Sequence, residues 1–119
     1  MVEIKFRVYQ PDAKEDLQWW SWQEMLSMDM NQFFRDKQGK FKLMQYTGLK
    51  DKDGVEVYEG DIVHVINEKE DWDHVGFIRY RPAFGAWIVD LLEDNFNFLH
   101  EYKEVKVVGN IYDNPEFLT

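Results

Sequence analysis

Cysteine is absent from this chain of 119 residues, which excludes disulfide bonds, thiolate metal sites, iron–sulfur clusters and thiol nucleophiles. Long apolar runs are absent too, and no stretch approaches the roughly 18 residues that a membrane-spanning helix needs. Basic residues are few: 14 Lys and Arg stand against 23 Asp and Glu, and the formal net charge is −9. Phosphate backbones and anionic membrane surfaces repel such a chain, so the composition disfavours nucleic acids and membranes as partners.

The residues that are present are typical of a globular domain. Hydrophobic residues make up 45% of the chain and aromatic residues 17%, which argues against disorder. No repeat, low-complexity tract or linker-like segment interrupts the chain. We therefore expect one domain over residues 1–119, with an N-terminal strand and helix in 1–40 and a β-rich part in 41–119. The charged, alternating N-terminus does not resemble a signal peptide, and we expect a cytoplasmic protein.

Two local patterns predict the structure of the N-terminal part. Alternating apolar residues predict a half-buried first strand, whose inner face carries Val2, Ile4, Phe6 and Val8. Further along, Ser21 and Glu24 fit a capping box, in which each side chain accepts a hydrogen bond from the other residue's backbone N–H. Apolar residues at helical spacing follow this box, so the sequence predicts one helix over residues 21–35.

The β-rich part consists of short apolar segments separated by turn signals. The strongest signal is Asp51-Lys52-Asp53-Gly54, because Gly54 readily adopts positive φ and aspartates accept local backbone hydrogen bonds. The predicted strands cover residues 41–46, 55–58, 62–66, 75–81, 86–92 and 104–112. This spacing predicts a mainly β (α+β) fold, either a small SH3-like barrel or a highly curved antiparallel sheet with one short N-terminal helix.

The residues that could hold a metal ion are scattered. His64, His74 and His100 lie in separate segments, whereas a zinc site needs three or four converging ligands. Asp51 and Asp53 resemble the start of a calcium loop, but the downstream ligands of such a loop are missing. We therefore expect neither a metal nor another cofactor.

Catalytic chemistry is not indicated either. Glu59 and Asp61 flank a glycine in a turn, where Asp61 can accept hydrogen bonds from neighbouring backbone amides, so a structural role is favoured over an acid–base pair. Ser21 and Ser27, the two serines of the chain, fall in the predicted helix and not in a nucleophile elbow. We predict no catalytic residues and no enzymatic activity.

Three segments remain as candidate interaction surfaces. Trp19, Trp20 and Trp22 are first interpreted as core residues, but so many neighbouring tryptophans are hard to bury in a small domain, and exposure would mark an interface between copies of the chain. Residues 51–73 hold nine acids and two lysines, an excess of about seven negative charges. Such a segment ordinarily serves solubility, and alternatively it imitates nucleic acid or docks a basic host protein.

The third segment, residues 76–81, interleaves aromatic and basic side chains. Phe77 and Tyr80 could stack on bases while Arg79 and Arg81 neutralise phosphates, as in weak single-stranded nucleic-acid binders. The net charge of −9 opposes this interpretation, and alternate residues of a strand normally face the core.

Four stretches of the sequence resemble the YopX-like family of small phage and prophage proteins: IKFR at 4–7, LMQYTGLKDKDG at 43–54, VYEGDIV at 57–63 and VKVVGNIYDNPE at 105–116. The resemblance implies a phage-encoded, intracellular accessory protein with a β-rich fold and self-association, and it supplies no catalytic motif. Residues 13–40 and 64–100 are the divergent parts.

The shared residues can all be architectural, since glycines suit tight turns and tyrosines combine an apolar ring with a polar end. The structural candidates are Tyr46, Thr47, Gly48, Gly54, Tyr58, Glu59, Gly60, Asp61, Gly109, Asn110, Tyr112 and Pro115. Our leading hypothesis is a non-enzymatic protein-interaction module that forms homo-oligomers and binds a host or phage protein. The acidic surface and the weak nucleic-acid binder are the alternatives.

Overall fold

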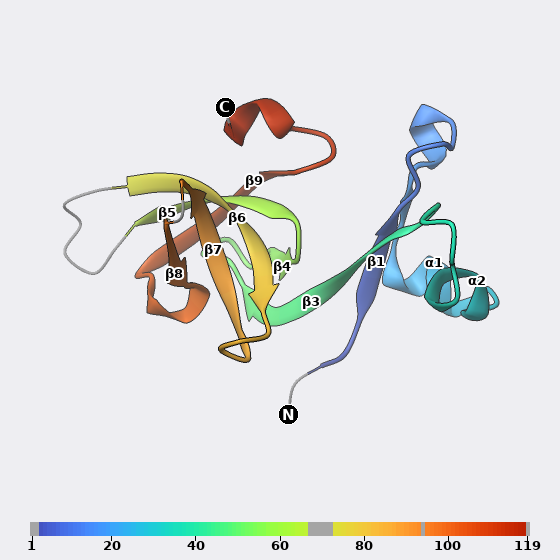
Figure 1. Cartoon of the computed structure of the whole chain (residues 1–119), viewed down its shortest axis with the longest axis horizontal. Helices are drawn as coiled ribbons and strands as arrows, with labels where there is room; N and C mark the ends of the chain where they lie inside the picture. The colour runs from blue at the N-terminus through green and yellow to red at the C-terminus, as the bar shows by residue number, and fades with distance from the viewer. Residues whose placement is uncertain (1–2, 67–72, 94, 119) are drawn as a thin grey trace. The chain divides into compact units, whose positions relative to one another are not determined.

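The computed structural model describes residues 3–66, 73–93 and 95–118 (Figure 1). The chain divides into two compact units, Met1–Tyr46 and Thr47–Thr119. The fold is mainly β, with two antiparallel sheets and a few short helices. One domain over residues 1–119 stays a prediction.

The N-terminal unit is built on a small antiparallel sheet. Its central strand β1 (Phe6–Tyr9) pairs with β2 (Trp19–Trp20) on one side and with β3 (Lys42–Lys50) on the other. The predicted strand at 2–9 is thus too long at its start: its ladder begins at Phe6, opposite Gln45, and Ile4 before it is 67% exposed. Val2 lies outside the described residues.

The capping box is confirmed, but the single helix over 21–35 is wrong. Glu24 N–H donates to Ser21 Oγ (3.2 Å) and Ser21 N–H donates to Glu24 Oε1 (3.0 Å), which lowers the pKa of the Glu24 carboxyl. This box starts α1 (Trp22–Leu26), and α2 (Asn31–Phe34) is a separate helix.

The break between the two helices comes from polar side chains that bond the backbone. Ser27, at the end of α1, donates its hydroxyl to the Glu24 carbonyl (2.7 Å). Asp29 accepts the N–H of Asn31 (3.0 Å) and so forms a local turn just before α2. Ser and Asp compete in this way with continued helix, and the apolar spacing alone did not reveal it.

Aromatic side chains complete the core of this unit. Val8, Met25 and Phe33 are buried, and partly buried apolar side chains surround them. Phe33 makes edge contacts with Trp20 (5.4 Å between ring centroids) and with Phe41 (5.1 Å). The short helix η1 (Glu15–Leu17) precedes β2.

The C-terminal unit begins within β3, which here neighbours β4 (Glu56–Tyr58). A second antiparallel sheet has the order β8-β7-β6-β5-β9. Its strands are β5 (Asp61–Ile66), β6 (Asp73–Arg81), β7 (Ala86–Leu92), β8 (Asn95–Phe98) and β9 (Glu104–Asn110), with the short helices η2 (Leu99–Glu101) and η3 (Pro115–Leu118).

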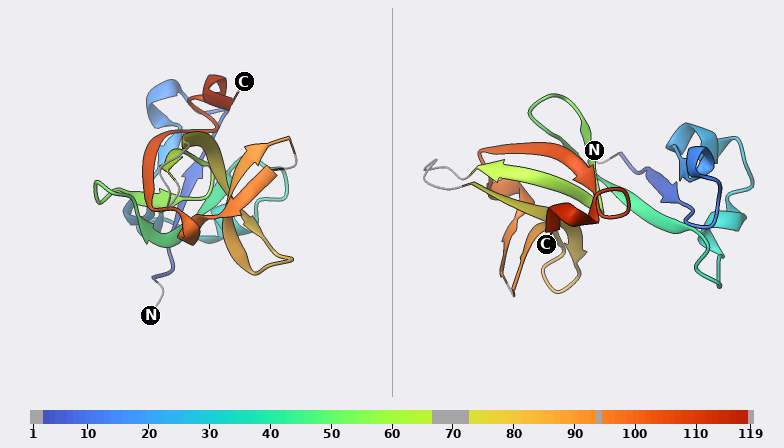
Figure 2. Two further views of the ribbon diagram at one scale, coloured as in Figure 1. Left: turned by 90° about the vertical axis from the view of Figure 1, so that its left-hand side faces the viewer. Right: turned by 90° about the horizontal axis from the view of Figure 1, so that it is seen from above.

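This second sheet is bent. In Figure 1, β6 starts alongside β5 and curves towards the direction of β7, and the two views of Figure 2 show the same twist. Its core holds the buried side chains Val57, Val63, Val65, Ile78, Val89 and Leu99. Among the described strands β8 and β9 are the two edges and do not pair, so the ladder stays open and the SH3-like barrel is not confirmed.

Most strands predicted in residues 41–119 are present, with three main differences. The strand predicted over 41–46 is too short, since β3 continues to Lys50. β9 ends at Asn110 and not at residue 112, because the Asn110 side chain accepts the N–H groups of Tyr112 and Asp113 and turns the chain. The strand β8 was missed, since asparagines alternate with its two phenylalanines and asparagine is depleted in strands.

Gly76, on β6, should be sensitive to the smallest substitution. A Cβ atom there would lie 2.6 Å from the Asp90 carbonyl oxygen and 2.7 Å from a Val89 methyl, closer than packing allows. We expect Gly76→Ala to lower the free energy of unfolding by about 2 kcal/mol, as overpacking does. The control is Gly54→Asn: nothing lies within 4 Å of its Cβ position, so it should cost only the backbone strain of a φ of 82°, which Asn bears better than most side chains. Urea unfolding measures both, and equal stabilities would contradict the packing argument.

Candidate functional site

The structural candidates come from three of the four family stretches, which are numbered here in chain order: 43–54, 57–63 and 105–116. The first of these three builds the end of β3 through backbone hydrogen bonds. Tyr46 is buried, its N–H donates to the Lys5 carbonyl (2.9 Å), and the Lys5 ammonium lies 4.8 Å from its ring centroid. The buried Thr47 donates its hydroxyl to the Val57 carbonyl (2.8 Å) and accepts the N–H of Leu49 (3.2 Å). Gly48, between Thr47 and Leu49, adopts a φ of 87°, which glycine reaches at no steric cost.

The carboxylate of Asp51 is the most heavily used polar group in this stretch. The side chain is 8% exposed. Its Oδ1 accepts the N–H groups of Asp53 (2.8 Å) and Val55 (2.9 Å), which closes the turn at Gly54. Its Oδ2 accepts the N–H of Val107 (2.9 Å), 56 residues further along the chain. The sequence predicted the turn at Asp51-Lys52-Asp53-Gly54 and local backbone bonds to its aspartates, but not the bond from Val107 to Asp51.

Asp51 also covers the edge of the second sheet. Lys52 N–H donates to the Val105 carbonyl (3.0 Å), next to the bond from Val107 to Asp51. These two groups on β9 lie two residues apart and therefore point to the same side, away from β5. An open strand edge invites pairing with another chain, and here the β3–β4 turn occupies part of it.

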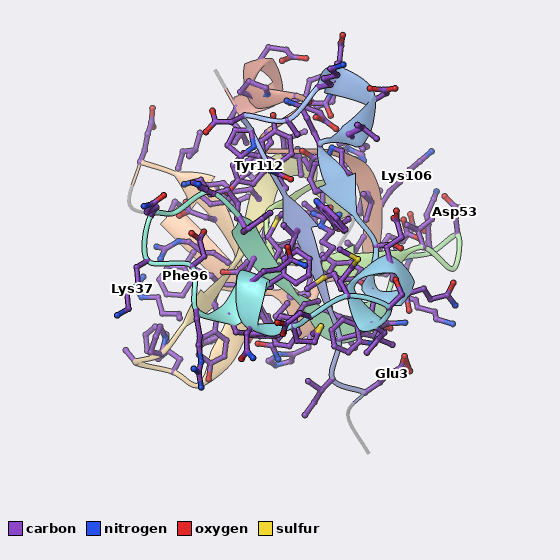
Figure 3. The ribbon with its side chains drawn as sticks, turned by 90° about the vertical axis from the view of Figure 1, so that its right-hand side faces the viewer. Glu3, Lys37, Asp53, Phe96, Lys106 and Tyr112 are labelled. Carbon is purple, nitrogen blue, oxygen red and sulfur yellow. The ribbon has the colours of Figure 1, made fainter. Side chains whose placement is uncertain are left out.

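Electrostatics favour the ionised form of Asp51. Burial raises the pKa of its carboxyl, but the N–H groups of Val107, Val55 and Asp53, together with the charge of Lys106, outweigh burial and leave the pKa below its ordinary value. Lys106 and Asp53 project outward on one side of the view in Figure 3.

The second stretch forms the turn between β4 and β5. Asp61 is 2% exposed, and its Oδ2 accepts the N–H of Tyr58 (2.8 Å), so the expected backbone bond is present. Gly60 has a φ of 87°, donates its N–H to the Ile78 carbonyl (2.8 Å) and accepts the N–H of Ile111 (2.9 Å). Glu59 is half-buried in the same turn and Tyr58 is buried. The Asp61 carboxylate thus serves the turn.

The third stretch forms the turn after β9. Asn110 Oδ1 accepts the N–H groups of Tyr112 (3.0 Å) and Asp113 (2.9 Å), while Asn110 N–H donates to Asn114 Oδ1 (3.2 Å). A Cβ at Gly109 would lie 2.5 Å from that same oxygen of Asn114, so glycine is needed.

Pro115 then begins η3, a position where a missing N–H costs nothing, and Tyr112 is half-buried (labelled in Figure 3). The shared residues of the three stretches therefore maintain turns and strand ends.

The three histidines are not brought together. His64 is paired with Val75 and His74 with Val65 on neighbouring strands, so the two side chains point to opposite faces of the sheet. His100, in η2, stacks on Phe98 (5.8 Å). Within residues 3–66, 73–93 and 95–118, no group of three or more His, Asp or Glu side chains is placed to hold a metal ion.

The basic and aromatic segment 76–81 forms contacts within its own sheet. Arg79 Nε donates to Asp90 Oδ2 (2.8 Å), so this guanidinium is paired. Arg81 lies over the rings of Phe84 (5.4 Å) and Phe96 (4.9 Å). Sequence reasoning missed these two phenylalanines, which come from the β6–β7 turn and from the overlooked strand β8.

The three tryptophans are half-buried, between the two outcomes foreseen for them. Trp19 packs on Tyr9 (4.9 Å) and Trp22 on Phe6 (5.9 Å), while Trp20 Nε1 donates to Gln10 Oε1 (3.2 Å). Trp20 and Trp22 pack against the core of the N-terminal unit, and all three tryptophans leave part of their surface exposed.

The predicted acidic surface at 51–73 is smaller than its composition indicates. Asp51 and Asp61 are buried and bonded to backbone N–H groups. Residues 67–72, with Glu68, Glu70 and Asp71, lie outside the described residues, and nothing is described of the Asp73 side chain.

Replacing Asp51 should destabilise the C-terminal unit. Asp51→Ala leaves three N–H groups without their acceptor, and we expect it to lower the free energy of unfolding by about 2–4 kcal/mol. Asp51→Asn keeps one oxygen and should cost about 1–2 kcal/mol. The exposed neighbour Asp53→Asn is the matched control and should stay within about 0.5 kcal/mol of wild type in urea unfolding. If all three variants unfold alike, Asp51 is not the anchor.

The contribution of Asp51 to the free energy of unfolding should also depend on pH. Because the pKa of Asp51 is lowered in the folded state, its carboxylate stabilises the fold above the unfolded pKa of about 3.9 and loses this contribution as the pH falls through the folded value. The stability gap between wild type and Asp51→Asn should therefore narrow from about pH 5 downwards. Thermal unfolding over a pH series measures the gap, and a constant gap would contradict this assignment.

No helix of the described residues has both the length and the apolar composition that crossing a membrane requires. None of the curated proteins matches the chain. Among solved structures, the crystal structure of protein EF1440 from Enterococcus faecalis is similar over 100% of both chains, with a TM-score of 0.58 and 21% sequence identity, which shows a shared fold. The model of the family described as YopX protein matches residues 3–119. That match spans nearly the whole chain, and this protein belongs to the YopX family.

Proposed function

We propose that this protein is a non-enzymatic accessory protein of a phage or prophage, which works in the bacterial cytoplasm as a protein-interaction module and self-associates through its N-terminal unit. The family supports the setting, since the resemblance of the sequence pointed to small phage and prophage proteins. The surface of the N-terminal unit supports the mode of action.

The absence of enzymatic activity is proposed from the use of the family residues. The two acids most suited to chemistry, Asp51 and Asp61, are buried and accept backbone N–H groups. A catalytic acid or base must instead reach a substrate proton. The Thr47 hydroxyl donates to the Val57 carbonyl, and Asn110 Oδ1 accepts the N–H of Tyr112. These residues of the family-like stretches are thus bonded within the fold.

The observation that carries the interaction is a set of exposed apolar side chains in residues 22–34, on the two short helices and on the segment between them. Leu26 is 58% exposed, Met28 43% and Phe34 48%, all within thirteen residues of chain that start at Trp22. Behind them Phe6 packs against Phe34 (5.3 Å) and Trp22 (5.9 Å). The unit has few fully buried side chains to offset this exposure, and exposed apolar clusters of this kind mark interaction sites.

A second copy of the chain is the partner that this surface fits. Residues 22–34 contain two acids, Glu24 and Asp29, and no base, so the surface offers little charge for a basic or acidic partner to recognise. Two identical apolar patches are complementary to each other in a two-fold dimer. Because each copy has a net charge of −9, the two repel one another, and salt should strengthen the association by screening.

The alternatives receive less support. Asp51 and Asp61 cannot contribute to an acidic surface that docks a basic protein, because both are buried. Arg79, which would have to neutralise a phosphate of a single-stranded nucleic acid, is already paired with Asp90. Arg81 and its two phenylalanine rings favour this second alternative, but the net charge opposes it.

We expect the wild-type protein to sediment as a dimer or larger oligomer, and Leu26→Gln with Met28→Gln to sediment as a monomer, because both side chains are exposed and their loss removes apolar area from the interface. Analytical ultracentrifugation at 50 and 500 mM salt, on the order of a threefold change in screening length, makes the measurement.

The matched control is Ile4→Gln with Leu17→Gln, since these side chains are 67% and 61% exposed in the same unit but lie outside α1, α2 and the segment between them. This control should associate like wild type. A wild-type protein that stays monomeric at about 100 μM, where an association worth roughly 5 kcal/mol would be half formed, contradicts the proposal.

A further inference from the structure

A cavity of about 240 Å³ lies in the C-terminal unit, between the end of β3 and the segment that joins η2 to β9. Its apolar lining includes Val57, which is 1% exposed, and Leu99, which is 3% exposed, and both belong to the core of this unit. Val105 and the 43% exposed Leu49 complete the apolar lining. The cavity therefore reaches from the surface to the core and offers an apolar site to a small molecule.

Lysines gather around this cavity in a chain that is otherwise acidic. Lys50, Lys52 and Lys103 line it, and Lys106 lies close enough to lower the pKa of Asp51. Four of the 14 basic residues of the chain thus come from two short segments, 50–52 and 103–106, which the Asp51 hydrogen bonds hold together. The fold concentrates positive charge here although the whole chain carries −9.

The two acids that line the cavity neutralise this charge incompletely. Asp51 accepts three backbone N–H groups and is turned to the backbone. Glu104 faces Lys52 at 3.9 Å, and the two side chains are 44% and 46% exposed. Such a long and exposed ion pair is weak, so a ligand carboxylate can replace Glu104 as the partner of Lys52. The lining thus holds three lysines and two acids, and Lys52 is the lysine whose ion pair a ligand carboxylate can displace.

Tyr102 adds a polar group to the apolar wall. Burial raises the pKa of its phenol, the bond from Asn97 Nδ2 to the phenol oxygen (3.2 Å) lowers it, and the charge of Glu101 raises it, with a net rise. The phenol is therefore neutral at physiological pH and does not repel an anion.

We propose that this cavity binds a small organic anion, made of an apolar body that enters between Leu49, Leu99 and Val105 and a carboxylate that meets Lys52 and Lys103. The volume of about 240 Å³ is below the roughly 300–1,000 Å³ of drug-sized sites, and it fits an aromatic ring with a short chain. This site is separate from the proposed self-association surface, since it lies in the other unit and uses other side chains.

The probe for the test is 4-phenylbutyrate, with 4-phenylbutanol as the uncharged analogue and inorganic phosphate as an anion without an apolar body. Titration followed by heteronuclear NMR should show saturable shifts at Leu49, Leu99 and Val105. We expect the alcohol to bind at least about fivefold more weakly, a difference of about 1 kcal/mol. Phosphate should give no saturable shifts at the three apolar residues.

Variants locate the site on the protein. Lys52→Gln and Lys103→Gln should each weaken 4-phenylbutyrate about three- to fivefold, and Leu49→Asn should weaken the acid and the alcohol alike. Lys106→Gln is the matched control, since it removes the same charge three residues beyond Lys103 but does not line the cavity. All four positions are exposed, so the variants should keep the wild-type spectrum elsewhere.

Equal binding of acid and alcohol to the wild-type protein would overturn the charged part of the proposal. If Lys106→Gln and Lys103→Gln weaken the binding of 4-phenylbutyrate equally, the protein surface attracts anions in general and the cavity is not the specific site. Absence of saturable shifts at the three apolar residues would overturn the site itself, and none of these outcomes depends on whether the protein self-associates.

Discussion

The fold of the C-terminal unit depends on one carboxylate that replaces a missing neighbouring strand. Asp51 accepts two N–H groups of its own turn and one from β9, 56 residues away in sequence. A buried carboxylate is costly unless several donors surround it, and here the donors are two backbone N–H groups of the turn and that of Val107 at the sheet edge. The carboxylate gains the donors that it needs, and the backbone N–H groups gain an acceptor. The same bonds set the β3–β4 turn against η2 and β9 and so create the cavity between them.

The stretches that resemble the family contain several residues of this kind, so the resemblance points to a fold more directly than to an activity. Thr47, Asp61 and Asn110 all use short polar side chains to hold backbone groups at strand ends. Gly109 is required because the Asn114 side chain occupies the place of a Cβ. Substituting such residues breaks a turn, whatever the protein binds. The features that could distinguish one member from another, such as the helices of the N-terminal unit, lie in the stretches where the resemblance is weakest.

Local chemistry was predictable from the sequence, and long-range pairing was not. The capping box at Ser21, the positive φ of Gly54 and the backbone bond of Asp61 each depend on residues within four positions, and all three are confirmed. The second role of Asp51 needed the position of Val107, which no local pattern supplies. The break between the two helices was local but hidden, because apolar spacing continues across Ser27 and Asp29 while their side chains compete for the backbone. The spacing of the strands could not decide whether the second sheet closes into a barrel.

Net charge acts differently on the two proposed surfaces, because screening separates long-range from short-range effects. At physiological salt, charges more than about 8 Å apart scarcely interact, so the −9 of the chain acts mainly as mutual repulsion between copies that approach closely. The apolar helices must overcome that repulsion, and added salt helps them. At the cavity the lysines lie within the screening distance of a bound anion, and added salt weakens their attraction. The two proposed surfaces therefore depend on salt in opposite ways. The reason is one charge distribution, in which the lysines of segments 50–52 and 103–106 depart from the acidic character of the rest of the chain.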